Sequence, residues 1–302
     1  MKSTKKSSKR IAIVGAGLSG LALSIALIPH FSVTLFEKEH VGAGASKILS
    51  GLLHPYPGKF GRLSLKAVEA MEAALQLLSL IEKFTQRDLA SYGGIIKQGE
   101  CLGRREDVKQ LAPHLYWIQS GVTVYMQPYL QGLYQYAEHL GVVYKNQEIE
   151  EIKELQEFDT VVLTCGAGIR QFAYLHTLPL SFLRGQVLIC SLSSPLFLSV
   201  IKPEHSQLVM QDAAFCQIGS TYERNREGDI PCQEEAIALL KPHLPVHRVY
   251  AAERVLCKGG YFPVVAKLSP SLYSITGLGS RGLLYHAYTA QILKERIREE
   301  VG

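Results

Sequence analysis

The spacing of hydrophobic residues predicts strands alternating with helices along the chain. Apolar runs of four or five residues predict buried strands at Ile11–Val14, Val33–Phe36, Thr160–Leu163 and Leu272–Thr276. Apolar residues also recur at helical spacing, which predicts a helix from Ser64 to Phe84. Its expected buried face carries Leu65, Val68, Met71, Leu75, Leu78 and Ile81. Further helices are expected at Leu18–Leu27, Gln127–Leu140, Gln233–Leu240 and Leu283–Ile297. This order is typical of an α/β protein with a parallel sheet.

Two other stretches show a different pattern. From Gly93 to Met126, and again from Leu180 to Tyr250, short strand-like runs alternate with turns. A brief helix is expected around Arg105–Leu111. Short strands joined by tight turns form mostly antiparallel sheets. The sequence therefore predicts a second, mostly antiparallel α+β domain inserted into the α/β domain.

The first strand leads directly into a glycine-rich turn. Gly15 permits a tight turn, Gly17 lets the backbone approach a pyrophosphate, and Gly20 lets the following helix pack against the sheet. The helix N-terminus then offers unpaired N–H groups to an anion. Glu37 ends the second strand, where its carboxylate can accept hydrogen bonds from a ribose and repel a 2′-phosphate. These features predict a dinucleotide site for FAD or NAD.

Composition narrows the class of protein. The chain has 302 residues, 47% of them hydrophobic, with a net charge of +5 and no apolar run long enough to cross a membrane. A cytoplasmic location is expected. The basic N-terminal segment, residues 1–10, is read as a solvated tail that could weakly attract an anionic partner such as RNA. The six cysteines show no metal-ligand spacing, so we expect thiols and no metal site.

An ordered set of motifs resembles one family. VGAGLSG with Glu37 is followed by GAGASKILSGLLHP, QPYLQGLYQYAEHLGV, VVLTCGAG, FLRGQ, IGSTYE, Arg254 before GYFPVV, and GLGSRGLLYHAYTAQIL. The chain thereby resembles the D-amino-acid-oxidase-like flavoproteins. The GSRGL segment resembles the final loop of one subgroup of this family. That subgroup is the C-terminal FAD domain of the bifunctional enzyme that makes 5-methylaminomethyl-2-thiouridine in tRNA. The chain is also similar to glycine oxidase. The resemblance implies non-covalent FAD, bound by a Rossmann-like domain beside a mostly antiparallel α+β substrate domain.

The resemblance also implies domain boundaries and cofactor contacts. The FAD-binding domain is expected at residues 1–88, 128–178 and 253–302, and the substrate domain at residues 89–127 and 179–252. The implied FAD-binding residues are Gly15, Ala16, Gly17, Leu18, Ser19, Gly20, Glu37, Lys38, Gly44, Ala45, Ser46, Gly51, Leu52, Gly166, Ala167, Gly168, Gly279, Ser280, Arg281, Gly282 and Leu283.

The reacting end of the implied site centres on two arginines. Arg254 lies where the family grips a substrate carboxylate, and a guanidinium suits a bidentate clamp. Arg281 would stabilise negative charge on reduced flavin. Glu253 departs from the family's glycine before the arginine. Candidate pocket residues are Tyr222, Tyr261, Tyr285 and His286.

Three functions remain open at this level. The first is oxidation of the C–N bond in the carboxymethylaminomethyl group of a modified tRNA wobble uridine, with hydride transfer to flavin N5, imine hydrolysis and glyoxylate release. The second is oxidation of free glycine, sarcosine or a D-amino acid. The third is a flavin-binding protein without catalysis. The expected partners are thus tRNA or a small amine.

Overall fold

The computed structural model describes residues 9–58, 60–100, 106–194, 196–202, 207–210, 214–224, 226–260 and 262–301. Most of the predicted N-terminal tail, Cys101 and the pocket candidate Tyr261 lie outside these residues.

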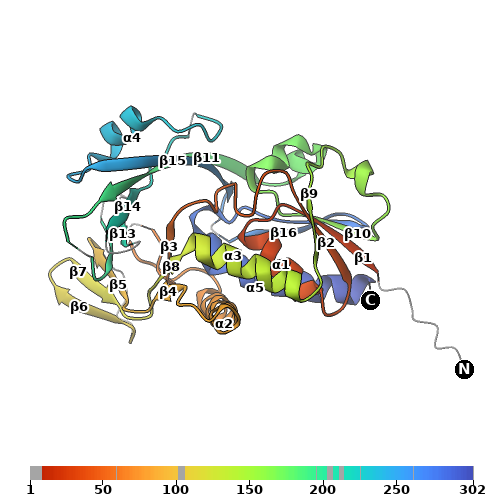
Figure 1. Cartoon of the computed structure of the whole chain (residues 1–302), viewed down its shortest axis with the longest axis horizontal. Coiled ribbons are helices and arrows are strands. Elements are labelled where there is room, and N and C mark those ends of the chain that lie inside the picture. The colour runs from red at the N-terminus through yellow and green to blue at the C-terminus, as the bar shows by residue number, and fades with distance from the viewer. Residues whose placement is uncertain are drawn as a thin grey trace, which may run out of the picture.

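A six-stranded sheet forms one half of the described structure (Figure 1). Its order is β16 (Val264–Ser269), β17 (Leu272–Thr276), β10 (Thr160–Leu163), β1 (Arg10–Val14), β2 (Ser32–Glu37) and β9 (Val143–Asn146). All neighbours are parallel except β16 and β17. The four strands predicted from apolar runs are therefore confirmed as neighbours in one sheet.

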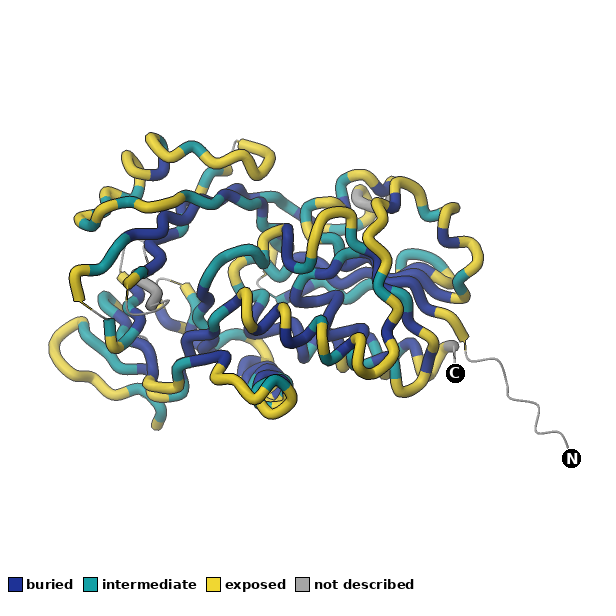
Figure 2. Tube along the Cα trace, in the orientation of Figure 1, coloured by how far each residue is buried: buried dark blue, intermediate teal, exposed yellow. Residues whose placement is uncertain are grey.

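Both faces of this sheet are covered, which explains why its central strands are apolar throughout. Ile11 and Ile13 face a core shared with helices α1 (Leu18–Leu27), α2 (Ala67–Thr85), α3 (Met126–His139) and α5 (Gly282–Val301). Ala12 and Val14 face the other side, where short 3-10 helices, η1 (Ile152–Leu155) and η2 (Gly166–Gln171), follow β9 and β10. Figure 2 shows the buried segments concentrated in these layers.

An eight-stranded sheet forms the other half. Its order is β15 (Val246–Cys257), β11 (Leu180–Ser191), β14 (Phe215–Gly219), β13 (Gln207–Met210), β12 (Ser199–Ile201), β5 (Ile95–Gln98), β7 (Leu115–Ile118) and β6 (Val108–Ala112). Only β12 and β5 are parallel. The predicted mostly antiparallel sheet is thus confirmed, with α4 (Gln233–Leu240) packed on β11 and β15.

The long strands β11 and β15 run from this sheet toward the parallel sheet in Figure 1. A small sheet of β3 (Ser50–Leu53), β8 (Val122–Tyr125) and β4 (Ala90–Ser91) lies between the two halves. This small sheet pairs β3, which precedes the predicted domain boundary at residue 88, with β8 and β4, which follow it. The predicted division of the chain into five domain segments stays a prediction.

Two local predictions were wrong. Of the brief helix expected around Arg105–Leu111, Arg105 lies outside the described residues, and Val108–Leu111 belong to strand β6, because Val108 and Lys109 pair with Ile118 and Trp117 of β7. Pairing with the next strand in a hairpin overrides local helix preference here. Helix α2 begins at Ala67, and Leu65 and Val68 from its expected buried face are each 66% exposed. Met71, Leu78 and Ile81 are buried as predicted, and alanines complete the buried face. Among the described helices, none has the length and apolar character of a membrane span.

Candidate functional site

The glycine turn after β1 packs against the end of β10. Gly15 has φ of +105°, and a Cβ added there would lie 2.7 Å from the Cα of Cys165. A Cβ at Gly20 would lie 1.9 Å from the carbonyl oxygen of Gly15. The hydroxyl of Thr164 donates to that same carbonyl over 2.9 Å. Only glycine fits at these two positions, so the turn lies directly between α1 and the carboxyl ends of β1 and β10.

The N-terminus of α1 is open to a ligand. Its N-cap Gly17 has no side-chain cap, and the first turn carries no acidic residue. The closest hydroxyl, that of Ser46, accepts from the N–H of Leu18 at 3.4 Å, which is long for a hydrogen bond. A Cβ at Gly44 would meet nothing within 4 Å. The uncapped backbone N–H groups and the open space at Gly44 suit a pyrophosphate.

Glu37 reaches this turn from β2. Its carboxylate accepts from the N–H of Ala16 at 2.8 Å and from the N–H of Glu39 at 3.2 Å. The acid therefore lies next to the predicted phosphate site, where a ribose would follow. Lys38 turns away and pairs with Glu148 at 3.5 Å on the surface.

The glycines after β10 lie next to the glycine turn after β1. Gly166 and Gly168 begin η2 directly after Cys165, the residue that packs on Gly15. A Cβ at Gly166 would meet nothing within 4 Å. Burial raises the pKa of Cys165 to about 12, so its thiol stays protonated and unreactive.

The N-terminus of α5 lies beside that of α1. A Cβ at Gly282 would lie 3.6 Å from Leu18 of α1, and one at Gly51 of β3 would lie 2.4 Å from Leu283. The 3-10 turn η4 (Gly279–Arg281) leads into α5. The structure thus brings together the predicted residues of Gly15–Gly20, Ser46, Gly51 and Gly279–Leu283, although they come from four parts of the chain.

Arg254 approaches the same region from strand β15. Two residues further along this strand, Leu256 pairs with Leu278 at the start of η4. The Arg254 guanidinium donates to the carbonyl of Thr221 at 3.2 Å and lies 5.0 Å from the ring of Tyr222. Burial lowers the pKa of Arg254 from its usual value. Among the described residues, no carboxylate forms an ion pair with Arg254, whose neighbour Glu253 points to the other face and pairs with Arg170.

Two of the pocket candidates have structural contacts. The hydroxyl of Tyr285 donates to the carbonyl of Leu65 at 2.6 Å. His286 is 1% exposed and lies between Leu283 and Tyr129, with both ring nitrogens at 2.8 Å from a partner. Of the described candidates, Tyr222 alone contacts Arg254.

A buried histidine that was not among the predicted site residues lies at the end of β3. His54 follows β3 directly, is 6% exposed, and its Nδ1 has no hydrogen-bond partner. Burial, together with the positive charges of Lys97 and Arg281, lowers its pKa to about 3, so it is neutral. Lys97 of β5 is itself only 2% exposed. In the sequence, this residue could have been found as a histidine directly after a short apolar run, in GLLHP.

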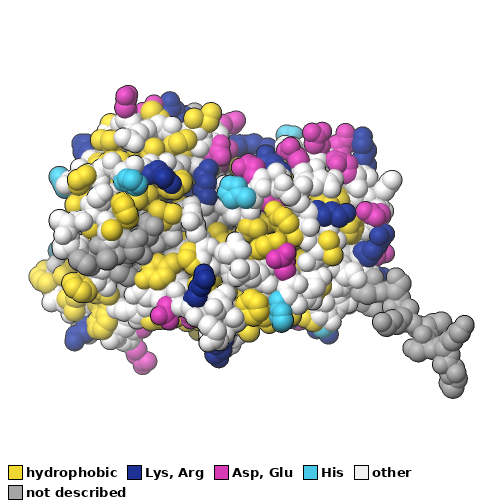
Figure 3. Space-filling view, viewed as in Figure 1, with side chains coloured by type: hydrophobic (Ala, Val, Ile, Leu, Met, Phe, Trp, Pro, Cys, Tyr) yellow, Lys and Arg dark blue, Asp and Glu magenta, His cyan; other side chains and the backbone are white. Residues whose placement is uncertain are grey.

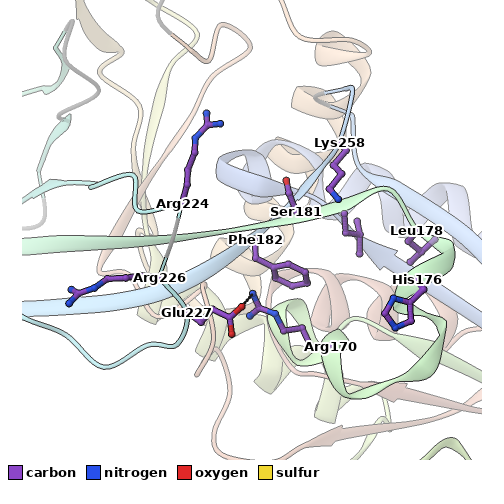
Figure 4. Close-up of a pocket in the computed structure, with 10 residues that line it drawn as sticks. Arg170, His176, Leu178, Ser181, Phe182, Arg224, Arg226, Glu227 and Lys258 are labelled. Atoms are coloured by element: carbon purple, nitrogen blue, oxygen red, sulfur yellow. Dashed lines mark hydrogen bonds and ion pairs between the residues drawn. The ribbon is translucent and has the colours of Figure 1, made fainter.

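A separate cavity of about 530 Å³ opens beside η2 and the ends of β11 and β15 (Figure 4). Arg170 stacks on Phe182, 3.6 Å from the ring centroid, and pairs with Glu227 at 3.5 Å. The remaining lining residues are His176, Leu178, Leu180, Ser181, Arg224, Arg226 and Lys258. The heads of Arg224 and Arg226 point away from Phe182 in Figure 4, so the cavity is only moderately basic near its aromatic wall.

Comparison with known proteins assigns this geometry to a family. The model of the family "FAD dependent oxidoreductase" matches residues 10–296. No curated protein matches the chain. Glycine oxidase from Geobacillus kaustophilus has a similar structure, with a TM-score of 0.82, 18% identity, and 97% of this chain and 95% of that chain covered.

Two further solved structures share the fold. Iminodiacetate oxidase from Chelativorans sp. BNC1 matches with a TM-score of 0.78 and 15% identity, covering 96% of this chain and 95% of that one. L-proline dehydrogenase from P. horikoshii matches with a TM-score of 0.75 and 14% identity, covering 97% and 94%. The likeness extends over almost the whole length of each chain.

Proposed function

The chain belongs to the family of FAD-dependent oxidoreductases, and on that basis we propose that it oxidises the C–N bond of a glycine-like secondary amine. The observation that carries the proposal is Arg254. Its partly buried guanidinium has no carboxylate partner among the described residues and lies in the strand that pairs with Leu278 at the start of η4. Buried charges are usually paired, so this position suits the carboxylate of a bound amino acid.

The names of the similar structures support the same class of substrate. Glycine oxidase and iminodiacetate oxidase both act, by name, on amines that carry a carboxymethyl group. Their identity to this chain is below 20%, so the substrate class rests on Arg254 together with these names.

The residues of the glycine turns fit FAD. We expect the pyrophosphate at the N-terminus of α1 beside Gly17, the adenosine ribose at Glu37, and the flavin beside Gly51 and the start of α5. Bound non-covalently, FAD supplies an acceptor for a hydride from the carbon next to the amine. The chain's own task is then to bind and orient the substrate.

Arg254 would fix the substrate carboxylate and thereby the position of the carbon next to it. The Thr221 carbonyl and the Tyr222 ring hold the guanidinium from the side. Glycine at position 51 lets β3 pack closely against Leu283 at the start of α5. The proposed arrangement needs no strong base, because a neutral amine can release a hydride once it is oriented.

Anaerobic reduction of the bound flavin tests this function. N-methylglycine should bleach the oxidised-flavin absorbance, whereas methoxyacetate, which has oxygen in place of the amine, should bind without bleaching it. A protein that binds FAD but is bleached by no amine would instead be a flavin-binding protein without catalysis.

A modified tRNA uridine is the second candidate substrate. The Gly279–Leu283 segment has the GSRGL sequence of the tRNA-modifying subgroup, and Arg170, Arg224, Arg226 and Lys258 line the cavity beside η2. On the face shown in Figure 3, however, Lys and Arg are interspersed with acidic and hydrophobic side chains and form no continuous basic surface. We therefore place the small amine first.

Nucleoside analysis distinguishes the two candidates. Incubation of the FAD-loaded protein with bulk tRNA should leave the carboxymethylaminomethyl nucleoside unchanged if the substrate is a small amine. Its loss, with release of glyoxylate, would select the tRNA.

A further inference from the structure

A buried glutamine of the eight-stranded sheet binds the backbone next to the proposed flavin site. Gln217 of β14 is 5% exposed. Its Oε1 accepts a hydrogen bond from the N–H of Leu49 at 3.2 Å, and its Nε2 donates to the carbonyl of Ser50 at 3.2 Å. The side-chain amide thus offers the start of β3 one acceptor and one donor, as the backbone of a neighbouring strand would.

The segment that Gln217 holds lies along the proposed FAD site. Ser46, three residues before Leu49, accepts from a backbone N–H at the N-terminus of α1. Gly51, two residues after Leu49, packs so closely on Leu283 at the start of α5 that an added Cβ would lie 2.4 Å from it. The position of this segment therefore affects both the pyrophosphate end and the flavin end of the site.

Gln217 and Arg254 project from the same face of the eight-stranded sheet. Gln217 lies opposite Ile189 of β11, and Arg254 lies opposite Leu183 of the same strand. These two β11 residues are an even number of positions apart, with no bulge between them, and side chains alternate between faces along a strand. The other face packs on α4 through Ala236. Gln217 and Arg254 therefore both face away from α4.

The chain that continues from β14 also positions the arginine. The Arg254 guanidinium donates to the carbonyl of Thr221 and lies over Gly185, where an added Cβ would be 2.6 Å from its Nη2 and 3.0 Å from the Thr221 oxygen. Thr221 is itself fixed to β11, because its N–H donates to the carbonyl of Gln186 at 2.9 Å and its hydroxyl accepts from the N–H of Gln186 at 2.7 Å. The clamp for a carboxylate thus depends on Thr221, four residues after Gln217.

The two contacts border one small space, because four residues of chain span at most roughly 14 Å. We propose that Gln217 is a positioning residue for the oxidation: it fixes β3, and with it the flavin, at a set distance from the carboxylate clamp of Arg254. The inference rests on the proposed function. Hydride transfer requires the substrate carbon close to the flavin, and a misplacement of about 1 Å can lower a rate by about 100-fold. Binding of the carboxylate requires only the clamp.

Reaction rate and affinity should therefore separate in Gln217→Met, which keeps the length of the side chain and removes both hydrogen bonds. We expect the limiting rate of anaerobic flavin reduction by N-methylglycine to fall about 10-fold or more. The affinity for methoxyacetate should stay within about twofold. Gln217→Glu, which keeps the acceptor for the Leu49 N–H, should recover part of the rate. A limiting rate that is unchanged in both variants would overturn the proposal.

The visible circular dichroism of the bound, oxidised flavin gives a readout that needs no turnover. This signal depends on how the flavin lies among the groups around it, so it should change in Gln217→Met. Gly185→Ala, which places a methyl group at the Arg254 guanidinium, should instead leave the signal unchanged and weaken methoxyacetate binding about 10-fold. A flavin signal in Gln217→Met identical to that of the wild type would contradict the proposed role.

Thr123→Val is the matched control. Thr123 of β8 and Ser199 of β12 form another buried hydrogen bond between the small sheet and the eight-stranded sheet, at 2.8 Å. Its loss should lower the melting temperature and leave the limiting rate within about twofold. A fall of the rate as large as in Gln217→Met would show that any loosening between the two sheets has this effect, and it would overturn a specific role for Gln217.

Failure of the proposed function looks different from failure of this inference. If the proposed function is wrong, N-methylglycine does not bleach the flavin of the wild-type protein. If only the inference is wrong, the wild-type protein is bleached and Gln217→Met is bleached at the same limiting rate.

Discussion

Arg254 shows how a single side chain can be prepared for a ligand. A guanidinium has five N–H donors in a plane, and one of them is used on the Thr221 carbonyl. The ring of Tyr222 lies against the same group. The side chain is thus oriented before substrate arrives, which lowers the entropic cost of binding a carboxylate.

Replacing Arg254 should affect substrate binding most. Arg254→Met is expected to cost about 2–5 kcal/mol of substrate binding, because the substrate carboxylate would be buried without its partner. Arg254→Lys should recover part of the charge but not the bidentate geometry. The measurement is the concentration dependence of anaerobic flavin reduction by N-methylglycine. Arg248→Met, at an exposed arginine of the same strand, is the control; an equal loss there would show that the effect is not specific to residue 254.

Gly20 is the residue that best tests the dinucleotide turn. In Gly20→Ala the new Cβ would lie 1.9 Å from the Gly15 carbonyl oxygen, so the backbone must move. Overpacking of this kind costs about 1–3 kcal/mol, and we also expect FAD to be lost on gel filtration. Gly260→Ala, where an added Cβ meets nothing within 4 Å, should keep both its FAD and its melting temperature. Retention of FAD by Gly20→Ala would contradict the predicted site.

At the scale of elements, a buried polar network fastens the segment after β14 to strand β11. Arg184 forms an ion pair with Glu223, and Gln186 donates to the same carboxylate at 3.0 Å. Burial alone would raise the pKa of Glu223, but hydrogen bonds from Thr221 and Gln186 and the charge of Arg184 hold it below its usual value. Thr221, which supports Arg254, is therefore held by this network.

Breaking the network should destabilise the protein. Arg184→Met leaves the Glu223 carboxylate buried without its ion pair, which costs about 3–5 kcal/mol of unfolding free energy. The double variant Arg184→Met with Glu223→Gln should regain much of the loss. Urea unfolding measures both. The exposed pair of Arg226 and Glu235 gives the comparison, since Arg226→Met should cost at most about 1 kcal/mol; similar costs at the two sites would refute the role of burial.

Elements also show where local sequence suffices. Strands of the parallel sheet were predictable because both of their faces are apolar. Strand β6 was not, because its five residues are largely exposed and their extended conformation depends on pairing with β7. The expected buried face of α2 failed at Leu65 and Val68 for a related reason. The packing of α5 and α3 selects the alanine side, which periodicity alone could not reveal.

At the scale of the whole molecule, α5 joins the two halves. Its first turn contacts α1 and β3, the preceding η4 contacts β15, and His286 bonds to Tyr129 of α3. Burial lowers the pKa of His286 to about 4, while backbone hydrogen bonds act in the opposite direction. The folded protein therefore keeps both His286 and His54 neutral.

This has a consequence for stability at acidic pH. Below the ordinary histidine pKa of about 6.5, the unfolded chain binds protons that the folded chain does not. The contribution is complete above this pH and is lost as the pH falls toward 4 for His286 and toward 3 for His54. As the pH falls, each of these two histidines should add up to about 1.4 kcal/mol per pH unit to the loss of unfolding free energy.

Denaturant unfolding between about pH 4.5 and pH 6.5 checks the slope. His286→Gln should reduce the slope of unfolding free energy against pH by up to the contribution of one bound proton. This holds whatever the effect of the substitution on stability at neutral pH. The exposed His30, replaced in the same way, is the control. A slope unchanged in His286→Gln would show that this residue is not the buried titrating group.

The sequence by itself determined the family, the order of strands and helices in the nucleotide-binding half, and the glycine turn. These follow from local features: apolar runs, glycines that no other residue can replace, and motifs in a fixed order. Only the tertiary structure decided which side chains share a site. Arg254 contacts Thr221, and Glu253 turns away to Arg170, because segments distant in sequence lie side by side around β11 and β15. Burial and electrostatic environment depend on that pairing, which no stretch of the chain contains on its own.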